Sequence, residues 1–207
     1  MKISYAELHC HTNYSFQEGA SSVEELLVQA KELGHRALAI TDHDNLCGAM
    51  HFAQVARSVG IQAITGAEVS LKDGSHLTLL AETQQGYSNL SRLISYAYIS
   101  GDRRNPGLDP KHLASLTEGL ILLTGCRRGR LPSLLAQGHQ NEAEEQLRQY
   151  LDWFGPSNVF VELQQNLVQG DTRCNRRLVQ LAREVGVEVS ATNNVHYHAA
   201  ERHRLQD

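Results

Sequence analysis

The sequence of 207 residues predicts an α/β fold in which seven parallel strands, mostly separated by helices, form a barrel. Two observations support this prediction: short apolar runs alternate with helical stretches along the chain, and almost every apolar run is followed by polar residues. Strands that alternate with helices favour a parallel sheet, and a closed parallel sheet gathers the polar ends of its strands on one face. We therefore expect a functional site on that face.

The first half of the chain repeats the order of strand, polar tip and helix. Ser22 and Glu25 form a capping-box pattern ahead of the first helix. Gly34 and Gly60 follow the first and second helices as stop signals. The expected strands cover 3–8, 37–41, 61–65 and 76–81, and the expected helices cover 23–33 and 46–59.

The second half continues the alternation less regularly. Gly155 and Pro156 break a long helical stretch, and Gly186 closes a later one. The expected strands cover 119–124, 159–163 and 187–192. Helices are expected over 88–99, up to 116, twice between 126 and 155, over 172–185, and from 199 onward.

The composition restricts the possible partners and the compartment. A net charge of -4 argues against a general nucleic-acid-binding surface, so any contact with DNA should be local. The cluster of Arg127, Arg128 and Arg130 fits either a contact with a phosphate backbone or an ordinary solvated face. The four cysteines form no C-x-x-C pair, and no signal peptide or membrane span is recognisable, which indicates a reduced cytoplasmic protein without membrane contact.

The eleven histidines are the one compositional anomaly, and two of them stand together. His9 and His11 are separated by one residue at the end of the first strand. Residues i and i+2 of an extended segment share a face, so the two imidazoles can bind one cation. Two hydrogen-bonded core histidines would show the same spacing, and the rest of the chain has to decide between these alternatives.

The other strand tips carry further imidazoles, carboxylates and one thiol. These groups are ligands for zinc, manganese or iron, and more than four of them imply more than one ion. Glu68 is the natural bridge, because its two oxygens can neutralise two neighbouring cations. Such ions suit phosphoester hydrolysis. The tip residues are Asp42, His43, Glu68, Cys126, Asn194 and His196. His76 instead stands at the beginning of a strand. Asp42 is expected to hold a ligand in place or to cap the following helix, rather than to bind the metal itself.

The segments LHCHTNYS, ALAITDHD, GAE, HLTLLA, TGC and TNNVHYH, in this order, resemble the PHP (polymerase and histidinol phosphatase) domain. The resemblance covers essentially the whole chain, so residues 1–207 are expected to be a single PHP domain, a distorted (β/α)7 barrel with up to three divalent metal ions. HLTLLAETQQGYSNLSRLIS is similar to the N-terminal PHP domain of bacterial C-family DNA polymerases, the α-type subunits of polymerase III. YAELHCHTNYSFQEGAS and HYHAAERHRLQD resemble the error-prone branch.

The resemblance also implies a ligand set, with zinc expected and manganese or iron as alternatives. The first site would use His9, His11 and Glu68, the second Glu68, His76 and Cys126, and the third Glu18, His43 and His196. His9, His11, Glu68 and Asn194 would carry the catalysis.

Two positions depart from the family pattern. Glu18 stands where related polymerases often have aspartate, and it can still ligate a metal ion. Asn194 stands where active members have the aspartate that completes the first site, and a neutral amide oxygen is a weaker ligand. We therefore expect metal at the second and third sites, weak binding at the first, and low hydrolytic activity.

Three functions follow from these expectations. The chain can be a metal-dependent phosphoesterase that acts on a DNA 3′ end, as a 3′-to-5′ exonuclease, or on pyrophosphate. It can be a structural metal module that contacts the remaining polymerase domains, or a free-standing phosphatase. The uncapped end at Asp207 argues against the third, because it indicates an N-terminal piece of a longer polymerase of DNA replication, repair and translesion synthesis. Nucleotide addition is not expected from this piece.

Overall fold

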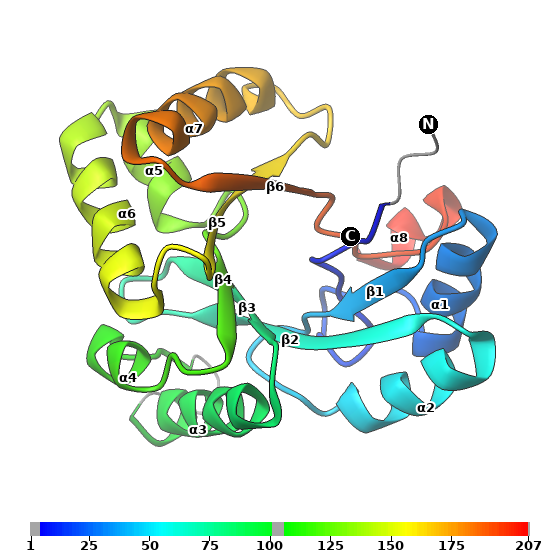
Figure 1. The fold of residues 1–207 in the computed structure, drawn as a ribbon. Helices are drawn as coiled ribbons and strands as arrows, with labels where there is room; N and C mark the ends of the chain where they lie inside the picture. Colours follow the sequence, from blue (N-terminus) through cyan, green and yellow to red (C-terminus); the bar gives the residue numbers. More distant parts are fainter. Residues whose placement is uncertain (1–4, 101–105, 207) are drawn as a thin grey trace.

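In the computed structural model, which describes residues 5–100 and 106–206, six strands form one curled sheet in chain order (Figure 1). The sheet bends into half a barrel, and this confirms the predicted α/β barrel class. The strands are β1 (Ala37–Ile40), β2 (Gln62–Ser70), β3 (His76–Ala81), β4 (Leu120–Leu123), β5 (Val159–Gln164) and β6 (Glu188–Thr192).

The strand expected over 3–8 does not belong to this sheet. Residues 3 and 4 lie outside the described residues, and the described part makes single bridges only. Glu7 pairs with Leu38 of β1, and Cys10 pairs with Val195 beyond β6, both in parallel. The N–H of His11 donates a hydrogen bond of 2.7 Å to the carbonyl oxygen of Val195. The segment 7–11 therefore lies between the two edges of the sheet and closes a distorted barrel.

The expectation of parallel strands is wrong for β3. This strand runs antiparallel to both β2 and β4, whereas the other neighbouring pairs are parallel. The link from β2 to β3 is a tight turn in which the N–H of Leu71 donates to the carbonyl of Ser75 at 2.8 Å. A parallel connection needs a crossover of a dozen or more residues, so this turn can only form a hairpin. His76 therefore begins β3 at the end where β2 finishes.

The helices cover the outside of the sheet (Figure 1). Ser22 and Glu25 form the expected capping box, and Gly60 ends its helix with a left-handed φ of 80°. The helices are α1 (Val23–Glu32), α2 (Ala49–Val59), α3 (Gln84–Ser100), α4 (Pro110–Ser115), α5 (Arg130–Gln137), α6 (Gln140–Phe154), α7 (Asp171–Val185), the 3-10 helix η1 (Ala200–Arg202) and α8 (His203–Gln206). Within the described ranges, none of them is long and apolar enough to span a membrane.

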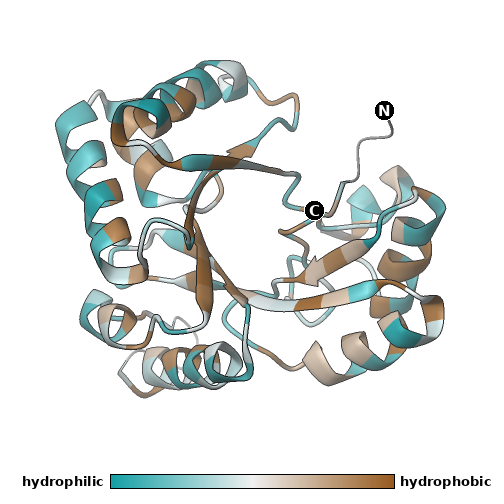
Figure 2. Cartoon of the chain, in the orientation of Figure 1, coloured by the Kyte–Doolittle hydropathy of each residue, from teal (hydrophilic) through white to brown (hydrophobic). Residues whose placement is uncertain are grey.

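Apolar side chains pack between the sheet and the helices. Figure 2 shows that the strands are largely hydrophobic, whereas the helices carry both hydrophobic and hydrophilic residues. The larger core lies between β2 to β5 and α3 to α7, and a smaller one lies under α1 and α2. A third cluster, around Ala39, Leu80 and Leu123, lies within the curve of the sheet. The imidazoles of His9 and His11 are also fully buried, with 0% exposure. Burial of such polar groups requires partners, which the following section describes.

Candidate metal centre

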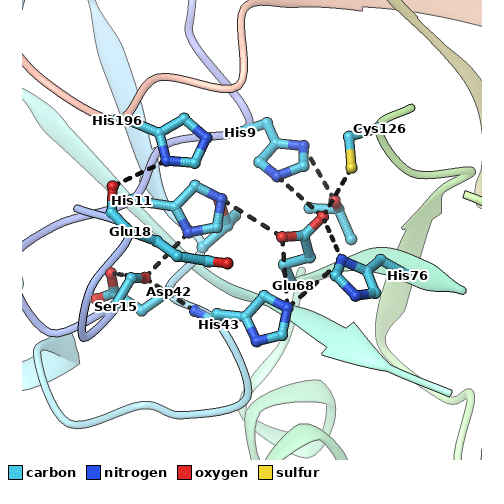
Figure 3. A network of polar contacts seen from close by, with 12 residues as sticks. His9, His11, Ser15, Glu18, Asp42, His43, Glu68, His76, Cys126 and His196 are labelled. Atoms are coloured by element: carbon cyan, nitrogen blue, oxygen red, sulfur yellow. Dashed lines mark hydrogen bonds and ion pairs between the residues drawn. The ribbon is translucent and has the colours of Figure 1, made fainter. Parts of the chain in front are cut away.

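The carboxylate of Glu68 is the centre of a cluster of four imidazoles and one thiol (Figure 3). Its side chain projects from β2, which continues to Ser70, so Glu68 lies within the strand rather than just after it. Pairing with β3 extends β2 beyond its predicted end. The distances to the Glu68 oxygens are 3.6 Å from His9 Nε2, 3.5 Å from His11 Nε2, 3.9 Å from His43 Nε2, 3.4 Å from His76 Nδ1 and 3.2 Å from Cys126 Sγ.

The cluster contains two groups whose ligand atoms lie within 4.8 Å of one another, and Glu68 is common to both. One group adds His9 and His11, the trio that the sequence assigned to a first metal. The other adds His43 and His76, whose Nε2 and Nδ1 atoms are 3.4 Å apart. The sequence had placed these two histidines in different sites. The hairpin of β2 and β3 brings His76 next to His43. The backbone of His43 also forms an isolated parallel β-bridge with that of Glu68.

Glu18 and His196 lie on another side of the same cluster. The His196 ring stacks on the ring of His11 with centroids 4.7 Å apart, and its Nδ1 atom contacts the Glu18 carbonyl oxygen at 3.0 Å. The Glu18 carboxylate points toward the cluster in Figure 3. Burial lowers the pKa of His196, and Glu18 offsets only part of this shift. Burial also opposes protonation of His43, but Asp44, Glu68 and Glu18 outweigh it and raise the pKa of His43. Arg128 approaches Glu18 Oε1 to 3.8 Å. Glu18 is thus near the two histidines with which the sequence grouped it.

Asn194 lines a cleft of about 420 Å³ together with Glu18, Glu68, Cys126 and His196. Its backbone is left-handed, with a φ of 50°, a conformation that asparagine and aspartate adopt more readily than most residues. Within the described part of the chain, its buried Oδ1 atom has no hydrogen-bond partner. An unpaired buried oxygen is costly, so a ligand in the cleft would satisfy it. The structure therefore brings Asn194 to the predicted site.

Three of the imidazoles each contact their own oxygen atom on the side away from Glu68, and this contact fixes the orientation of the ring. In each ring the Nδ1 atom makes the contact, which turns the Nε2 atom toward Glu68. Metal-binding histidines usually carry such a partner on the second nitrogen. The contacts are His9 Nδ1 to Glu162 Oε1 at 2.7 Å, His43 Nδ1 to Asp44 Oδ2 at 2.9 Å, and His11 Nδ1 to Ser15 Oγ at 3.0 Å.

The sequence profile of the PHP domain matches residues 7–166 of the chain. The chain belongs to the PHP domain family. Two curated relatives are the DNA polymerase III subunit alpha of Treponema pallidum and the error-prone DNA polymerase of Symbiobacterium thermophilum. They are 41% and 40% identical to this PHP domain over 100% and 99% of its length. The chain spans only 19% and 20% of these two relatives.

Solved structures confirm the fold of the PHP domain. A Bifidobacterium adolescentis protein assigned as a metal-dependent phosphoesterase has a TM-score of 0.62 at 14% identity, with 94% of this chain and 88% of that chain covered. Endonuclease Q, solved with a 27-mer duplex that has an abasic lesion at the active site, has a TM-score of 0.55 at 14% identity. That match covers 94% of this chain and 49% of the endonuclease. Identities this low establish the fold and no more.

The donor atoms of the PHP domain fit divalent transition metals. Imidazole, carboxylate and thiolate are the ligands that zinc, manganese and iron share. The Nε2 atoms of His9 and His11 are buried and, among the described residues, have no hydrogen-bond partner. Both atoms lie near the Glu68 carboxylate. A cation between the two imidazoles and the carboxylate would satisfy all three groups.

The electrostatics of the cluster suit a cation at Glu68. Burial opposes ionisation of Glu68, but the surrounding histidines outweigh it and hold the pKa of this carboxyl well below its usual range. Burial and the neighbouring His9 lower the pKa of His11, which keeps its imidazole neutral. Burial and Glu68 raise the pKa of the Cys126 thiol. A metal ion must therefore displace the thiol proton before Cys126 can ligate it.

Sequence reasoning missed Glu162 and Asp44. Glu162 is fully buried in β5, and the signal for it was its own charge within the apolar run VFVELQ. Asp44 follows the expected ligand His43 directly, and its φ of 54° is left-handed. Asp42 was expected to hold a ligand or to cap a helix. It accepts hydrogen bonds from Ser15 at 2.7 Å and from the backbone of Thr12 at 2.7 Å. Ser15 in turn contacts Nδ1 of His11 at 3.0 Å, so Asp42 reaches a ligand only through Ser15.

The metal-free chain is expected to lose stability as the pH rises through about 9. Burial opposes protonation of His9, but Glu162 and Glu68 outweigh it and raise the pKa of His9 to about 9. Because the pKa of His9 is higher in the folded chain than in the unfolded chain, protonation stabilises the fold. This contribution is complete at pH values below the unfolded pKa of about 6.5, and it is lost as the pH rises through the folded pKa. Urea unfolding with a chelator at pH of about 6.5 and about 9.5 measures the loss. The substitution His9→Gln should reduce it, and an equal loss in both proteins would contradict the assignment.

Proposed function

We propose that this PHP domain is part of a bacterial DNA polymerase III α-type subunit of the error-prone branch. We further propose that its cleft hydrolyses phosphoester bonds with bound divalent metal ions. The observation that carries the proposal is the buried Glu68 carboxylate, which has four imidazoles and a thiol within 3.9 Å. The polymerase relatives at 41% and 40% identity support the parent protein, of which the chain spans about a fifth.

We assign the metal ligands from this arrangement, with zinc as the first expectation and manganese or iron as alternatives. Glu68 is shared by a first site with His9 and His11 and a second site with His76 and Cys126. Glu18 and His196 form a third site with His43, which also borders the second. Bound ions would lower the pKa of water and neutralise charge on a phosphoryl oxygen.

The residues of the chain itself position these groups. Glu162 holds His9 by a contact of 2.7 Å and fixes the nitrogen that faces Glu68. His43 is partly exposed, with 21% of its side chain accessible, so a substrate can reach this edge of the cluster. We propose that His9, His11, Glu68 and Asn194 are the residues on which hydrolysis depends, and that the substrate is a DNA 3′ end.

A second candidate is a structural metal module that stabilises the polymerase and contacts its remaining domains. Asn194 favours this alternative, because its neutral amide oxygen lines the cleft where a carboxylate would hold a cation more strongly. A free-standing phosphatase is less well supported, since the relatives at 41% and 40% identity are polymerases. Cytoplasmic location remains an expectation. The four cysteines, all within the described residues, are free, and disulfides are rare in that compartment.

Metal analysis of protein purified without added metal tests the proposal. We expect more than one ion of zinc, manganese or iron per chain, and loss of thermal stability on chelation. A metal at about 100 times its dissociation constant contributes about 2.7 kcal/mol to the free energy of unfolding. Absence of all three metals would overturn the metal centre. Release of nucleotides from a labelled 3′ end separates the enzyme from the structural module, which would retain metal and stability without hydrolysis.

A further inference from the structure

A second cavity, of about 300 Å³, lies beside the metal centre between α5 and α7. Its polar lining consists of three arginines, Arg127, Arg173 and Arg177, and none of its lining residues is acidic. Its apolar lining includes Pro132 and Leu135 of α5. The whole chain has a net charge of -4, so three guanidinium groups around one small cavity are a local concentration of positive charge.

Arg127 connects this cavity with the metal cleft. It follows Cys126 directly in the sequence, and it lines both the cleft that contains Glu68 and the arginine cavity. Its side chain is 52% exposed, and one of its terminal nitrogens lies 3.4 Å from Asp171 Oδ1. An extended ligand with one end in the cleft would therefore pass Arg127 before it reaches the cavity.

The arginines retain free hydrogen-bonding capacity. Arg127 donates to the carbonyl of Gln169 at 2.9 Å, and Arg177 donates to the carbonyl of Leu135. A guanidinium has five N–H donors, so each of these contacts leaves several donors available. Arg173 is exposed, and within the described ranges it has no ion pair. Buried Asp171, which accepts hydrogen bonds from the backbone of Asn166 and Val168, is the one carboxylate paired with these arginines in the described residues.

We propose that the arginine cavity binds a backbone phosphate of a single-stranded nucleic acid whose terminal nucleotide occupies the metal cleft. The choice of nucleic acid rests on the proposed function. Guanidinium groups bind phosphate through paired charge-assisted hydrogen bonds, and such contacts position a strand without reading its sequence. The apolar floor, with Pro132, Leu135 and Ala136, suits a sugar or base attached to that phosphate. This site would hold the strand in register with the metal centre.

The test measures binding without catalysis. Fluorescence anisotropy of a labelled single-stranded oligonucleotide is recorded with the 207-residue chain in the presence of a chelator. Arg173→Gln should weaken binding about tenfold, since a hydrogen bond to a charged group contributes roughly that factor. It should also lower the slope of log affinity against log salt by about 0.7. Arg173→Lys keeps the charge and should retain part of the affinity.

The matched control is Arg183→Gln, which removes the same charge from an exposed position further along α7. Binding that falls equally in both variants would overturn the proposal, because it would show a general charge effect. Undetectable binding of the oligonucleotide to the unmodified chain would also overturn it, as would displacement by inorganic phosphate at the concentration of the oligonucleotide. The chelator keeps this test separate from the metal centre, because loss of the metal sites alone leaves the arginine result unchanged.

Discussion

Glu68→Gln is expected to remove bound metal from the first and second sites together. Both groups of ligand atoms share this carboxylate, so one substitution deletes a ligand and a negative charge from each. Loss of a supporting residue alone weakens metal binding about 10- to 100-fold, and loss of a bridging ligand should exceed that range. The stabilisation that a metal at these two sites supplies, about 2.7 kcal/mol at 100 times the dissociation constant, should disappear with it. Metal analysis and thermal unfolding with and without chelator measure both effects.

Glu24→Gln is the matched control for Glu68→Gln. Glu24 also contacts a histidine, with its Oε1 atom 2.8 Å from His51 Nε2, but its side chain is 53% exposed on α1. The control makes the same glutamate-to-glutamine change beside an imidazole, but at a position that has no other candidate metal ligands. We expect unchanged metal content and stability. Equal metal content in the Glu68 variant and the control would show that the ions, if present, bind elsewhere.

The sequence predicts the strands and helices well because their periodicity is local. Each of the six sheet strands overlaps a predicted one, and the capping box at Ser22 forms as expected. The direction of β3 is not a local property. It follows from the short turn after Leu71, whose length excludes a crossover. A count of turn residues would have indicated the hairpin, and with it the position of His76 at the functional end of the barrel.

The sequence predicted the parts of the site that depend on residue type and local spacing. It did not predict the parts that depend on contacts between distant segments of the chain. His9 and His11 share a face because of strand geometry, and the structure places both beside Glu68. The pairing of His43 with His76 arises from the hairpin, which the alternation of elements does not reveal. Glu162 contacts His9 across more than a hundred residues of sequence, so no spacing rule relates the two. Only its charge within an apolar strand signals a buried role.

Asn194→Asp is expected to strengthen the first metal site and to raise phosphoesterase activity about tenfold or more. Aspartate has nearly the same shape as asparagine and tolerates the left-handed backbone found here. It would replace a neutral oxygen that has no partner among the described residues with a charged one beside the cleft. Without metal, the added buried charge should lower stability. Chelated protein should therefore unfold more easily than the parent chain, and metal-loaded protein should unfold less easily.

Asn166→Asp is the control for the added charge. Asn166 is exposed and lines the same cleft, but it was not assigned as a ligand. It should change neither the metal content nor the hydrolysis of a labelled 3′ end and of a simple phosphomonoester. Higher activity in the Asn194→Asp variant, but not in the Asn166→Asp control, would mean that the weak ligand Asn194 limits the hydrolytic activity of an otherwise intact metal centre. Equal activity of the parent and the Asn194 variant on both substrates, with full metal content in each, would contradict the assigned role and favour the structural module.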